Sequence, residues 1–124
     1  MPKKILIIED EDDPRTYLEV LFQENGYETA TASDGDEAQT VVKQFQPDLI
    51  TLDIIMPHET GVKFYRNLHK DPALSKIPVI ILSGVTRYKE LFARDHATMP
   101  KPFAFVEKPF DKVELLSKVK EATK

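Results

Sequence analysis

Residues 47–57 read Pro-Asp-Leu-Ile-Thr-Leu-Asp-Ile-Ile-Met-Pro, and this segment decides the fold. Within it, residues 49–52 form a continuous run of apolar and β-branched side chains that ends at Asp53. A strand with one solvent-exposed face would alternate apolar and polar residues, whereas a continuous run is typical of a parallel strand covered on both faces. We therefore predict a central parallel strand with Asp53 at its carboxyl end.

Four other segments resemble strands. Continuous apolar runs lie at residues 5–8 and 79–82, and weaker candidates, which suit edge positions, lie at 27–31 and 103–107. The segments between these runs space their apolar residues with a helical period. Five strands alternating with about five helices indicate an open α/β sheet built from βαβ units.

Capping residues support this map of helices. Asp13-Pro14 is expected to supply the N-cap and the first residue of the first helix. The second helix should follow Asp34, the third should begin at Gly61, and Asp111 can cap the last. Four of the predicted helices therefore have a start signal beside their apolar pattern.

The composition indicates one domain. A chain of 124 residues, 41% of them hydrophobic, is long enough to bury a self-sufficient core. There is no cysteine, which excludes disulfides, thiol chemistry and cysteine-bearing zinc sites. The first apolar run lasts only four residues, far less than a secretion signal or a membrane span requires. We expect a single domain over residues 1–124, without an output domain, in the cytoplasm.

The charge of the chain is concentrated at one place. It carries 17 Lys and Arg against 21 Asp and Glu, a net charge of −4. Five of the acids form the unbroken run at residues 9–13, and without them the chain would be at +1. A chain without a broad basic field is not expected to bind nucleic acid directly, nor do we expect membrane binding.

Polar residues follow four of the predicted strands. They are Glu9, Asp10, Asp53, Ser83 and Lys108. In open α/β sheets, ligands bind beyond the carboxyl ends of the strands, so we expect these five side chains to converge at one edge. The remaining acids of the run, at residues 11–13, suit the start of a helix.

Three carboxylates at one edge predict a cation site. They would repel one another unless a cation compensates, and a few hard oxygen ligands suit Mg²⁺, with Mn²⁺ as a second possibility. A carboxylate beside such a cation can attack phosphorus and form an acyl phosphate, with Lys108 and Ser83 neutralising the phosphoryl group. Asp53 could instead be a buried structural acid, but its position after a central strand favours a functional role.

Several fragments together resemble the receiver domain of two-component response regulators, the family that includes the chemotaxis regulator. They are Ile-Leu-Ile-Ile-Glu-Asp-Glu at 5–11, the segment 47–57 with Gly61, Pro-Val-Ile-Ile-Leu-Ser-Gly at 78–84, and Lys-Pro-Phe at 108–110. The resemblance covers essentially the whole chain. It implies a flavodoxin-like three-layer sandwich with a parallel sheet in the order 2-1-3-4-5.

The resemblance also assigns roles to single residues. Asp53 would be the phosphoacceptor, and the metal would be held by Glu9, Asp10, Asp53 and the backbone carbonyl of Ile55. Ser83 resembles the switch hydroxyl, Lys108 the counter-ion of the phosphoryl group, and Phe105 the switch aromatic residue. Ile55 and Val85 occupy the two positions that tune access of water to the site.

The implied function is signal transduction in a phosphorelay. A histidine kinase or His-phosphotransfer protein would phosphorylate the domain, and the surface of the fourth helix, fifth strand and fifth helix would then change for a downstream output protein. We expect a monomer or weak dimer that is no enzyme, beyond catalysing its own phosphoryl transfer and a slow autodephosphorylation. Loss of the phosphoryl group is expected to be slow because neither the Ile55 nor the Val85 side chain can position an attacking water molecule.

Two features depart from the family pattern. Met-Pro-Lys-Pro at residues 99–102 stands where family members commonly carry a Gly-Ala pair, and two prolines prevent a helix from continuing. For residues 86–102 we therefore expect a short or mobile fourth helix followed by a loop. Thr60 replaces an acid often found before Gly61, which we interpret as a minor surface change.

Three other classes of protein share features with this sequence. A pseudo-receiver would bind partners without phosphorylation, but the complete set of acids, Ser83 and Lys108 disfavours it. A haloacid-dehalogenase-like phosphatase needs a second acid two positions after the nucleophile, where Ile55 stands. A flavin carrier of the flavodoxin type needs a phosphate-binding loop after the first strand, where residues 9–13 would repel phosphate.

Overall fold

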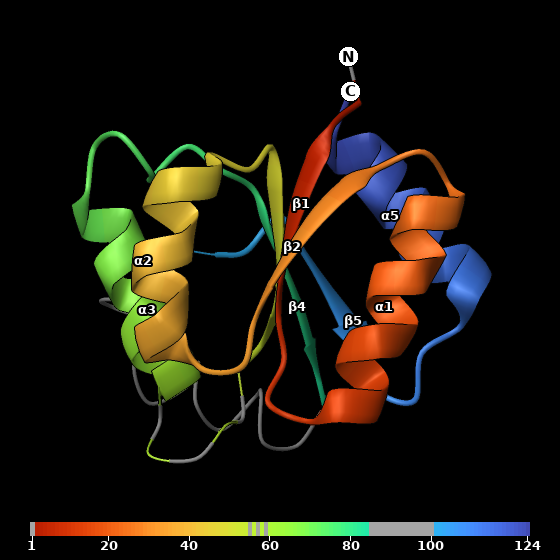
Figure 1. Cartoon of the computed structure of the whole chain (residues 1–124), viewed down its shortest axis with the longest axis horizontal. Helices are drawn as coiled ribbons and strands as arrows, with labels where there is room; N and C mark the ends of the chain where they lie inside the picture. Colours follow the sequence, from red (N-terminus) through yellow and green to blue (C-terminus); the bar gives the residue numbers. More distant parts are fainter. Residues whose placement is uncertain (1, 55, 57, 59, 85–100) are drawn as a thin grey trace.

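A five-stranded parallel sheet forms the centre of the molecule (Figure 1). The computed structural model describes residues 2–54, 56, 58, 60–84 and 101–124. The strands are β1 (Lys4–Ile8), β2 (Glu28–Ala32), β3 (Leu49–Asp53), β4 (Val79–Ser83) and β5 (Ala104–Glu107). Their order is β2-β1-β3-β4-β5, and every neighbouring pair is parallel. The predicted strand order is confirmed, and the two weaker strand candidates are the edge strands.

Helices cover both faces of the sheet, which confirms the three-layer α/β architecture (Figure 1). They are α1 (Asp12–Glu24) and α5 (Lys112–Ala122) on one face and α2 (Gly35–Phe45) and α3 (Thr60–Lys70) on the other. The expected short helix and loop at 86–102 fall almost wholly on residues 85–100, which lie outside the described residues.

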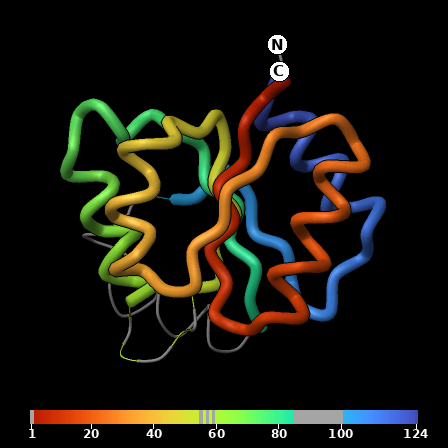
Figure 2. The backbone as a smooth tube through the Cα atoms, in the orientation of Figure 1, coloured from red at the N-terminus to blue at the C-terminus, as the bar shows by residue number. Residues whose placement is uncertain are grey.

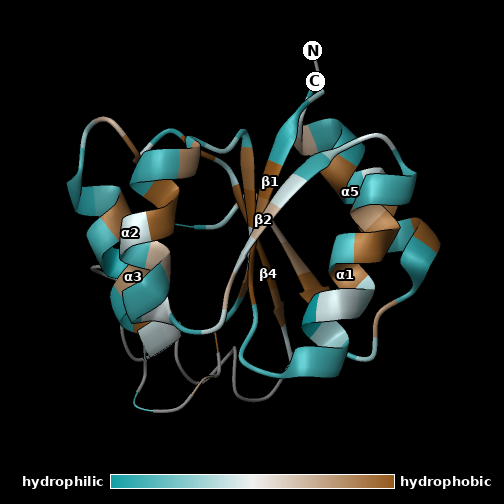
Figure 3. Ribbon diagram, in the orientation of Figure 1, coloured by the Kyte–Doolittle hydropathy of each residue, from teal (hydrophilic) through white to brown (hydrophobic). Residues whose placement is uncertain are grey.

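The core consists of two apolar layers separated by the sheet. All five residues of β3 and of β4 are buried, as the continuous apolar runs predict. Alternate residues of each strand enter opposite layers, so that Ile50 and Leu52 pack with α2 and α3, while Leu49 packs with α1 and α5. Figure 3 shows brown, hydrophobic segments in the inner strands and helices in which hydrophilic and hydrophobic residues alternate.

Two predicted caps are confirmed and two helix starts are corrected. The side chain of Asp34 accepts a hydrogen bond from the Glu37 amide at 2.7 Å, and that of Asp111 accepts one from the Val113 amide at 2.7 Å. The first helix begins at Asp12 rather than after Asp13, because proline is tolerated throughout the first turn, where amides have no acceptor within the helix. The third begins at Thr60, one residue before Gly61.

The topology separates the two edges of the sheet. Because all strands are parallel, their carboxyl ends share one edge, and Figure 2 shows that β1 begins and α5 ends at the opposite edge. Within the described parts of the chain, no helix is both long and apolar enough to cross a membrane. Residues 9, 10, 53, 83 and 108 all lie at or just beyond the carboxyl ends.

Candidate functional site

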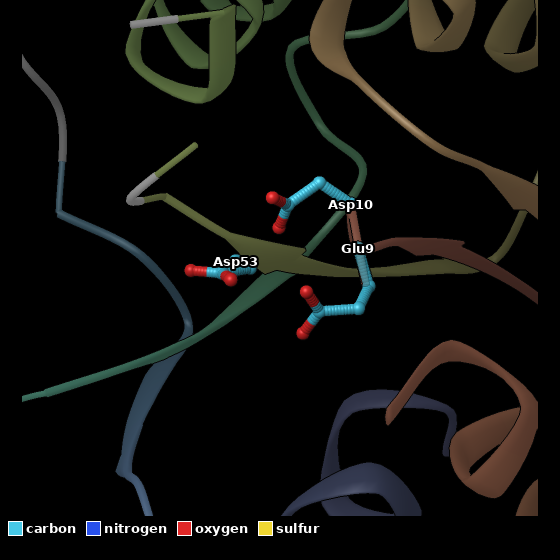
Figure 4. Close-up of side chains that lie close together, drawn as sticks. All are labelled: Glu9, Asp10 and Asp53. Atoms are coloured by element: carbon cyan, nitrogen blue, oxygen red, sulfur yellow. The ribbon is translucent and has the colours of Figure 1, made fainter. Parts of the chain in front are cut away.

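Three carboxylates meet at the carboxyl edge of the sheet. Asp53 ends β3, Glu9 and Asp10 directly follow β1, and these two strands are neighbours in register. One carboxylate oxygen from each residue lies within 4.8 Å of those of the other two. Figure 4 shows the three side chains pointing toward a common space. The sequence-based expectation that these acids converge therefore agrees with the geometry.

Glu9 is the most deeply buried of the three acids. Its residue surface is 1% exposed, against 7% for Asp53. Its Oε2 accepts a hydrogen bond from the Glu11 amide at 3.2 Å, and its own amide donates to the Ala32 carbonyl at 3.1 Å. These bonds hold the Glu9 side chain and backbone in one orientation toward the cluster.

Lys108 links two of the acids. Its Nζ donates to Glu9 Oε1 at 2.8 Å and to Asp53 Oδ2 at 3.2 Å. Its backbone amide donates to the Ser83 carbonyl at 2.9 Å, which attaches the segment after β5 to the end of β4. Burial by itself would lower the pKa of Lys108, but the hydrogen bond to Glu9 and the charges of Asp53 and Glu9 outweigh it and raise that pKa. Lys108 therefore remains cationic at neutral pH.

The acid cluster holds more negative charge than Lys108 neutralises. Partial burial and the hydrogen bond with Glu9 raise the pKa of Asp10, because both disfavour its ionised form. A divalent cation would relieve this crowding, and carboxylate oxygens suit Mg²⁺ or Mn²⁺. The donor set of Glu9, Asp10 and Asp53 therefore fits a hard divalent metal ion.

Ser83 places a hydroxyl beside the cluster. It ends β4, which pairs with β3 so that Asp53 lies opposite Leu82, and Ser83 is the next residue. Ser83 is 1% exposed, and its Oγ has no hydrogen-bond partner among the described residues. A buried hydroxyl without a partner costs free energy. A group added at this edge could therefore accept a hydrogen bond from Ser83 without breaking an existing one.

The remaining predicted site residues lie around this centre. Phe105 is half-buried in β5, opposite Ile81, and packs against the apolar layer of α2 and α3. Ile55 and Val85 lie outside the described residues, so their assigned roles stay predictions.

Thr60 is not the surface residue that the sequence suggested. It is only 9% exposed, and its Oγ1 accepts a hydrogen bond from the Gly35 amide at 3.1 Å. A Cβ atom at Gly35 would lie 2.0 Å from the Thr60 carbonyl oxygen, so the first residues of α2 and α3 are in backbone contact. The Gly35 amide lies in the first turn of α2 and has no acceptor within its own helix, so the Thr60 hydroxyl supplies one.

A second close approach connects α3 to the site itself. A Cβ atom at Gly61 would lie 2.7 Å from the Ile54 carbonyl oxygen and 2.9 Å from that of Asp53. Only glycine therefore lets α3 pack directly on the end of β3. The glycine after Thr60 in the sequence was the signal that this part of the chain makes a close contact.

Replacing Thr60 by Val is expected to lower the free energy of unfolding by about 1–2 kcal/mol, because the buried Gly35 amide loses its acceptor. Hydrogen exchange of that amide should accelerate in Thr60→Val and stay slow in Thr60→Ser, which keeps the hydroxyl. Urea unfolding followed by circular dichroism and amide exchange followed by NMR measure both effects. A Gly35 amide equally protected in all three proteins would contradict this prediction.

Arg15 is the other residue that the sequence did not single out. Its Nη1 donates to the backbone carbonyls of Glu9 and Asp10, at 3.1 and 3.4 Å, and its Nη2 pairs with Asp12. The only sequence signal was a basic residue closely following the acidic run.

The fold and the acid cluster define a receiver domain, and comparison with known proteins shows the family. Residues 5–120 match the family model of the response regulator receiver domain, so the chain belongs to that family. The chain is 32% identical over 122 residues to Protein Rrf1 of Nitratidesulfovibrio vulgaris, and the match covers 98% of this chain and 83% of that protein.

Other relatives are longer than this chain. The phosphate regulon transcriptional regulatory protein PhoB of Rhizobium meliloti is 32% identical over 120 residues, 97% of this chain but only 52% of that protein. The chain thus spans about half the length of PhoB, and 47% of a probable transcriptional regulator, ycf27, of Cyanophora paradoxa.

Solved structures agree with this assignment. The signal receiver domain of a signal transduction histidine kinase from Syntrophus aciditrophicus has a TM-score of 0.86 at 32% identity, with coverage of 98% of this chain and 89% of that one. The chemotaxis response regulator CheY4 of Vibrio cholerae has a TM-score of 0.84 at 26% identity, with coverage of 98% and 99%. Receiver domains are in general signalling domains rather than enzymes.

Proposed function

We propose that this receiver domain accepts a phosphoryl group on Asp53 in a Mg²⁺-dependent reaction, as part of a two-component phosphorelay. The observation that carries the proposal is the arrangement of Asp53 with Glu9 and Asp10 within 4.8 Å and Lys108 at 3.2 Å. A nucleophilic carboxylate, a donor set for a divalent cation and a fixed ammonium are the groups that phosphoryl transfer to an acid requires.

The proposed reaction moves the phosphoryl group from a histidine nitrogen of the partner to an oxygen of Asp53. The N–P bond breaks, the O–P bond to Asp53 forms, and the electron pair of the broken bond returns to the histidine nitrogen. Glu9, Asp10 and Asp53 would hold the Mg²⁺ ion, with the Ile55 carbonyl as the expected backbone ligand, and the ion would supply positive charge to neutralise the phosphoryl oxygens. Lys108 provides a second positive charge and Ser83 a hydrogen-bond donor.

Phosphorylation is proposed to act through Ser83 and Phe105. The added phosphoryl group carries nearly two negative charges and attracts the hydroxyl of Ser83, which has no partner among the described residues. Movement of Ser83 would leave space for Phe105, which is half-buried in the adjacent strand. The surface that includes β5 and α5 would then change the relative populations of its two conformations, and a partner would bind one of them preferentially.

The partners follow from the same proposal. A histidine kinase or His-phosphotransfer protein supplies the phosphoryl group, and a downstream output protein reads the changed surface. Residues 1–124 act as one receiver domain, as a monomer or weak dimer, without direct contact to nucleic acid or membrane. The transcriptional roles in the names of PhoB and ycf27 belong to those longer proteins.

The proposal is tested by incubation with a small phosphoryl donor such as acetyl phosphate, with and without Mg²⁺. Intact mass spectrometry should show one added phosphoryl group only with Mg²⁺, and peptide mapping should locate it on Asp53. A protein that stays unmodified but binds its partners equally well would instead be a phosphorylation-independent interaction module. The complete cluster with its bound lysine disfavours that alternative.

We also expect the phosphorylated protein to lose its phosphoryl group slowly, over minutes or longer rather than seconds. The expectation depends on the apolar side chains of Ile55 and Val85, neither of which can position an attacking water molecule. The decay is followed by intact mass after removal of the donor. Replacing Val85 by a polar residue of similar size, such as Thr, is the matched variant, and loss within seconds from the unaltered protein would refute the prediction.

A further inference from the structure

Arg15 lies in the first turn of α1, and its side chain folds back onto the loop that carries two of the acids. One guanidinium nitrogen, Nη1, donates to the carbonyl oxygen of Glu9 at 3.1 Å and approaches that of Asp10 at 3.4 Å. The other terminal nitrogen, Nη2, pairs with the carboxylate of Asp12. One side chain therefore contacts two residues of the loop between β1 and α1 and the first residue of α1.

The contacts to the carbonyl oxygens act on the metal-binding acids themselves. A bond to a carbonyl oxygen restricts the orientation of the peptide plane that contains it. The Glu9 and Asp10 side chains leave the backbone at the Cα atoms next to these two planes, so their directions are restricted as well. The planar guanidinium donates in fixed directions, so it restricts both planes at once. The Glu9 carboxylate is held in addition by the Glu11 amide and by Lys108, whereas no such bond from another residue is described for the Asp10 carboxylate apart from Glu9.

The pairing with Asp12 does not by itself explain the position of Arg15. The Asp12 side chain is 87% exposed, and ion pairs at such exposed sites contribute little to stability. The Arg15 side chain is only 21% exposed, because it lies against the loop rather than in solvent. The contacts to the loop carbonyls are thus the more consequential ones.

We propose that Arg15 is a positioning residue of the cation site, which holds the peptide groups of Glu9 and Asp10 so that their carboxylates face Asp53 before the metal ion binds. This inference rests on the proposed function, because it assumes that the cluster binds Mg²⁺. Arg15 does not contact the metal or the phosphoryl group; it acts through the orientation of two ligand residues. Such supporting residues commonly change metal affinity by about tenfold or more.

The test compares Mg²⁺ binding by isothermal titration calorimetry in four proteins: the unaltered chain, Arg15→Met, Arg15→Lys and Asp12→Asn. Arg15→Met keeps the length of the side chain but has no donor, and its dissociation constant for Mg²⁺ should rise about tenfold. Arg15→Lys keeps the charge without the planar fork and should fall between Arg15→Met and the unaltered chain. Asp12→Asn removes the charge of the exposed ion pair but leaves the carbonyl contacts, and it should bind Mg²⁺ within about twofold of the unaltered chain.

Unfolding in urea without metal separates positioning from a purely structural role. If Arg15→Met and Asp12→Asn lower stability alike while all four dissociation constants agree, Arg15 is only part of a surface ion pair and the inference is wrong. If Arg15→Met does not fold, Arg15→Lys decides, since affinity equal to that of the unaltered chain would overturn the inference. An unaltered chain that binds no Mg²⁺ would refute the proposed function, whereas normal binding by every variant would refute only the role of Arg15.

Discussion

Replacing Asp53 by Asn is expected to abolish phosphorylation, with a fall in rate of more than about a thousandfold. Asparagine has nearly the same shape, but its amide is neither charged nor nucleophilic, so no acyl phosphate can form. The amide introduced by Asp53→Asn also contributes less to a cation site than a carboxylate, so Mg²⁺ affinity should fall as well. Incubation with acetyl phosphate and Mg²⁺, followed by intact mass, measures the first effect, and calorimetry measures the second.

The matched control for this experiment is Asp13→Asn. Asp13 belongs to the same acidic run but lies exposed in the first turn of α1, outside the cluster of Glu9, Asp10 and Asp53. The Asp13→Asn protein should accept the phosphoryl group at the rate of the unaltered protein. Phosphorylation of Asp53→Asn at a comparable rate would show that another residue is the acceptor, and peptide mapping would identify it.

Replacing Lys108 by Met is expected to slow phosphorylation about a hundredfold, because the phosphoryl oxygens lose a fixed positive charge while the apolar stem of the side chain is retained. Without metal, the same change should lower the free energy of unfolding by about 1–3 kcal/mol. The loss arises mainly from Glu9, which is 1% exposed and would lose the ammonium that lies 2.8 Å from its Oε1. Solvent screens part of this interaction, because the Lys108 side chain is 30% exposed.

The stability effect of Lys108 also has a defined pH range. Its folded-state pKa is raised, because the bonds to Glu9 and Asp53 outweigh the opposing effect of burial. Its contribution is therefore complete below the ordinary pKa of lysine and is lost as the pH rises through the raised value. The difference in unfolding free energy between the unaltered protein and Lys108→Met should thus be largest at neutral pH and disappear in strong alkali.

Lys112→Met is the control for both measurements. Lys112 begins α5 and is exposed, and its change should alter stability by no more than about 0.5 kcal/mol and leave the phosphorylation rate unchanged. A Lys108→Met protein that accepts the phosphoryl group as fast as Lys112→Met would show that the ammonium takes no part in the transfer.

The elements of the fold could be predicted because their patterns are local. A continuous apolar run such as residues 49–52 identifies a buried strand without knowledge of its neighbours, and Asp34 and Asp111 mark helix starts within three residues of the amides they cap. The exact start of α1 could not be predicted, because several acids and a proline are all compatible with a first turn.

The members of the site were also accessible from the sequence, for a topological reason. Parallel strands end at one edge, so the polar residues that follow them must lie near one another. Which side chains bond to one another inside the site could not be predicted from the sequence. The bond of Lys108 to Asp53 joins residues 55 positions apart, and its bond to Glu9 joins residues 99 positions apart.

By itself, the sequence determined the α/β class, the buried strands and the identity of the acids, the hydroxyl and the lysine at their ends. The tertiary structure alone decided that Glu9 shares Lys108 with Asp53, that the Ser83 hydroxyl has no described partner, that Thr60 is buried against Gly35, and that Arg15 turns back onto the loop of the acids. The physical reason is range: strands and caps follow from neighbouring residues, whereas these contacts depend on how separate layers and loops pack together.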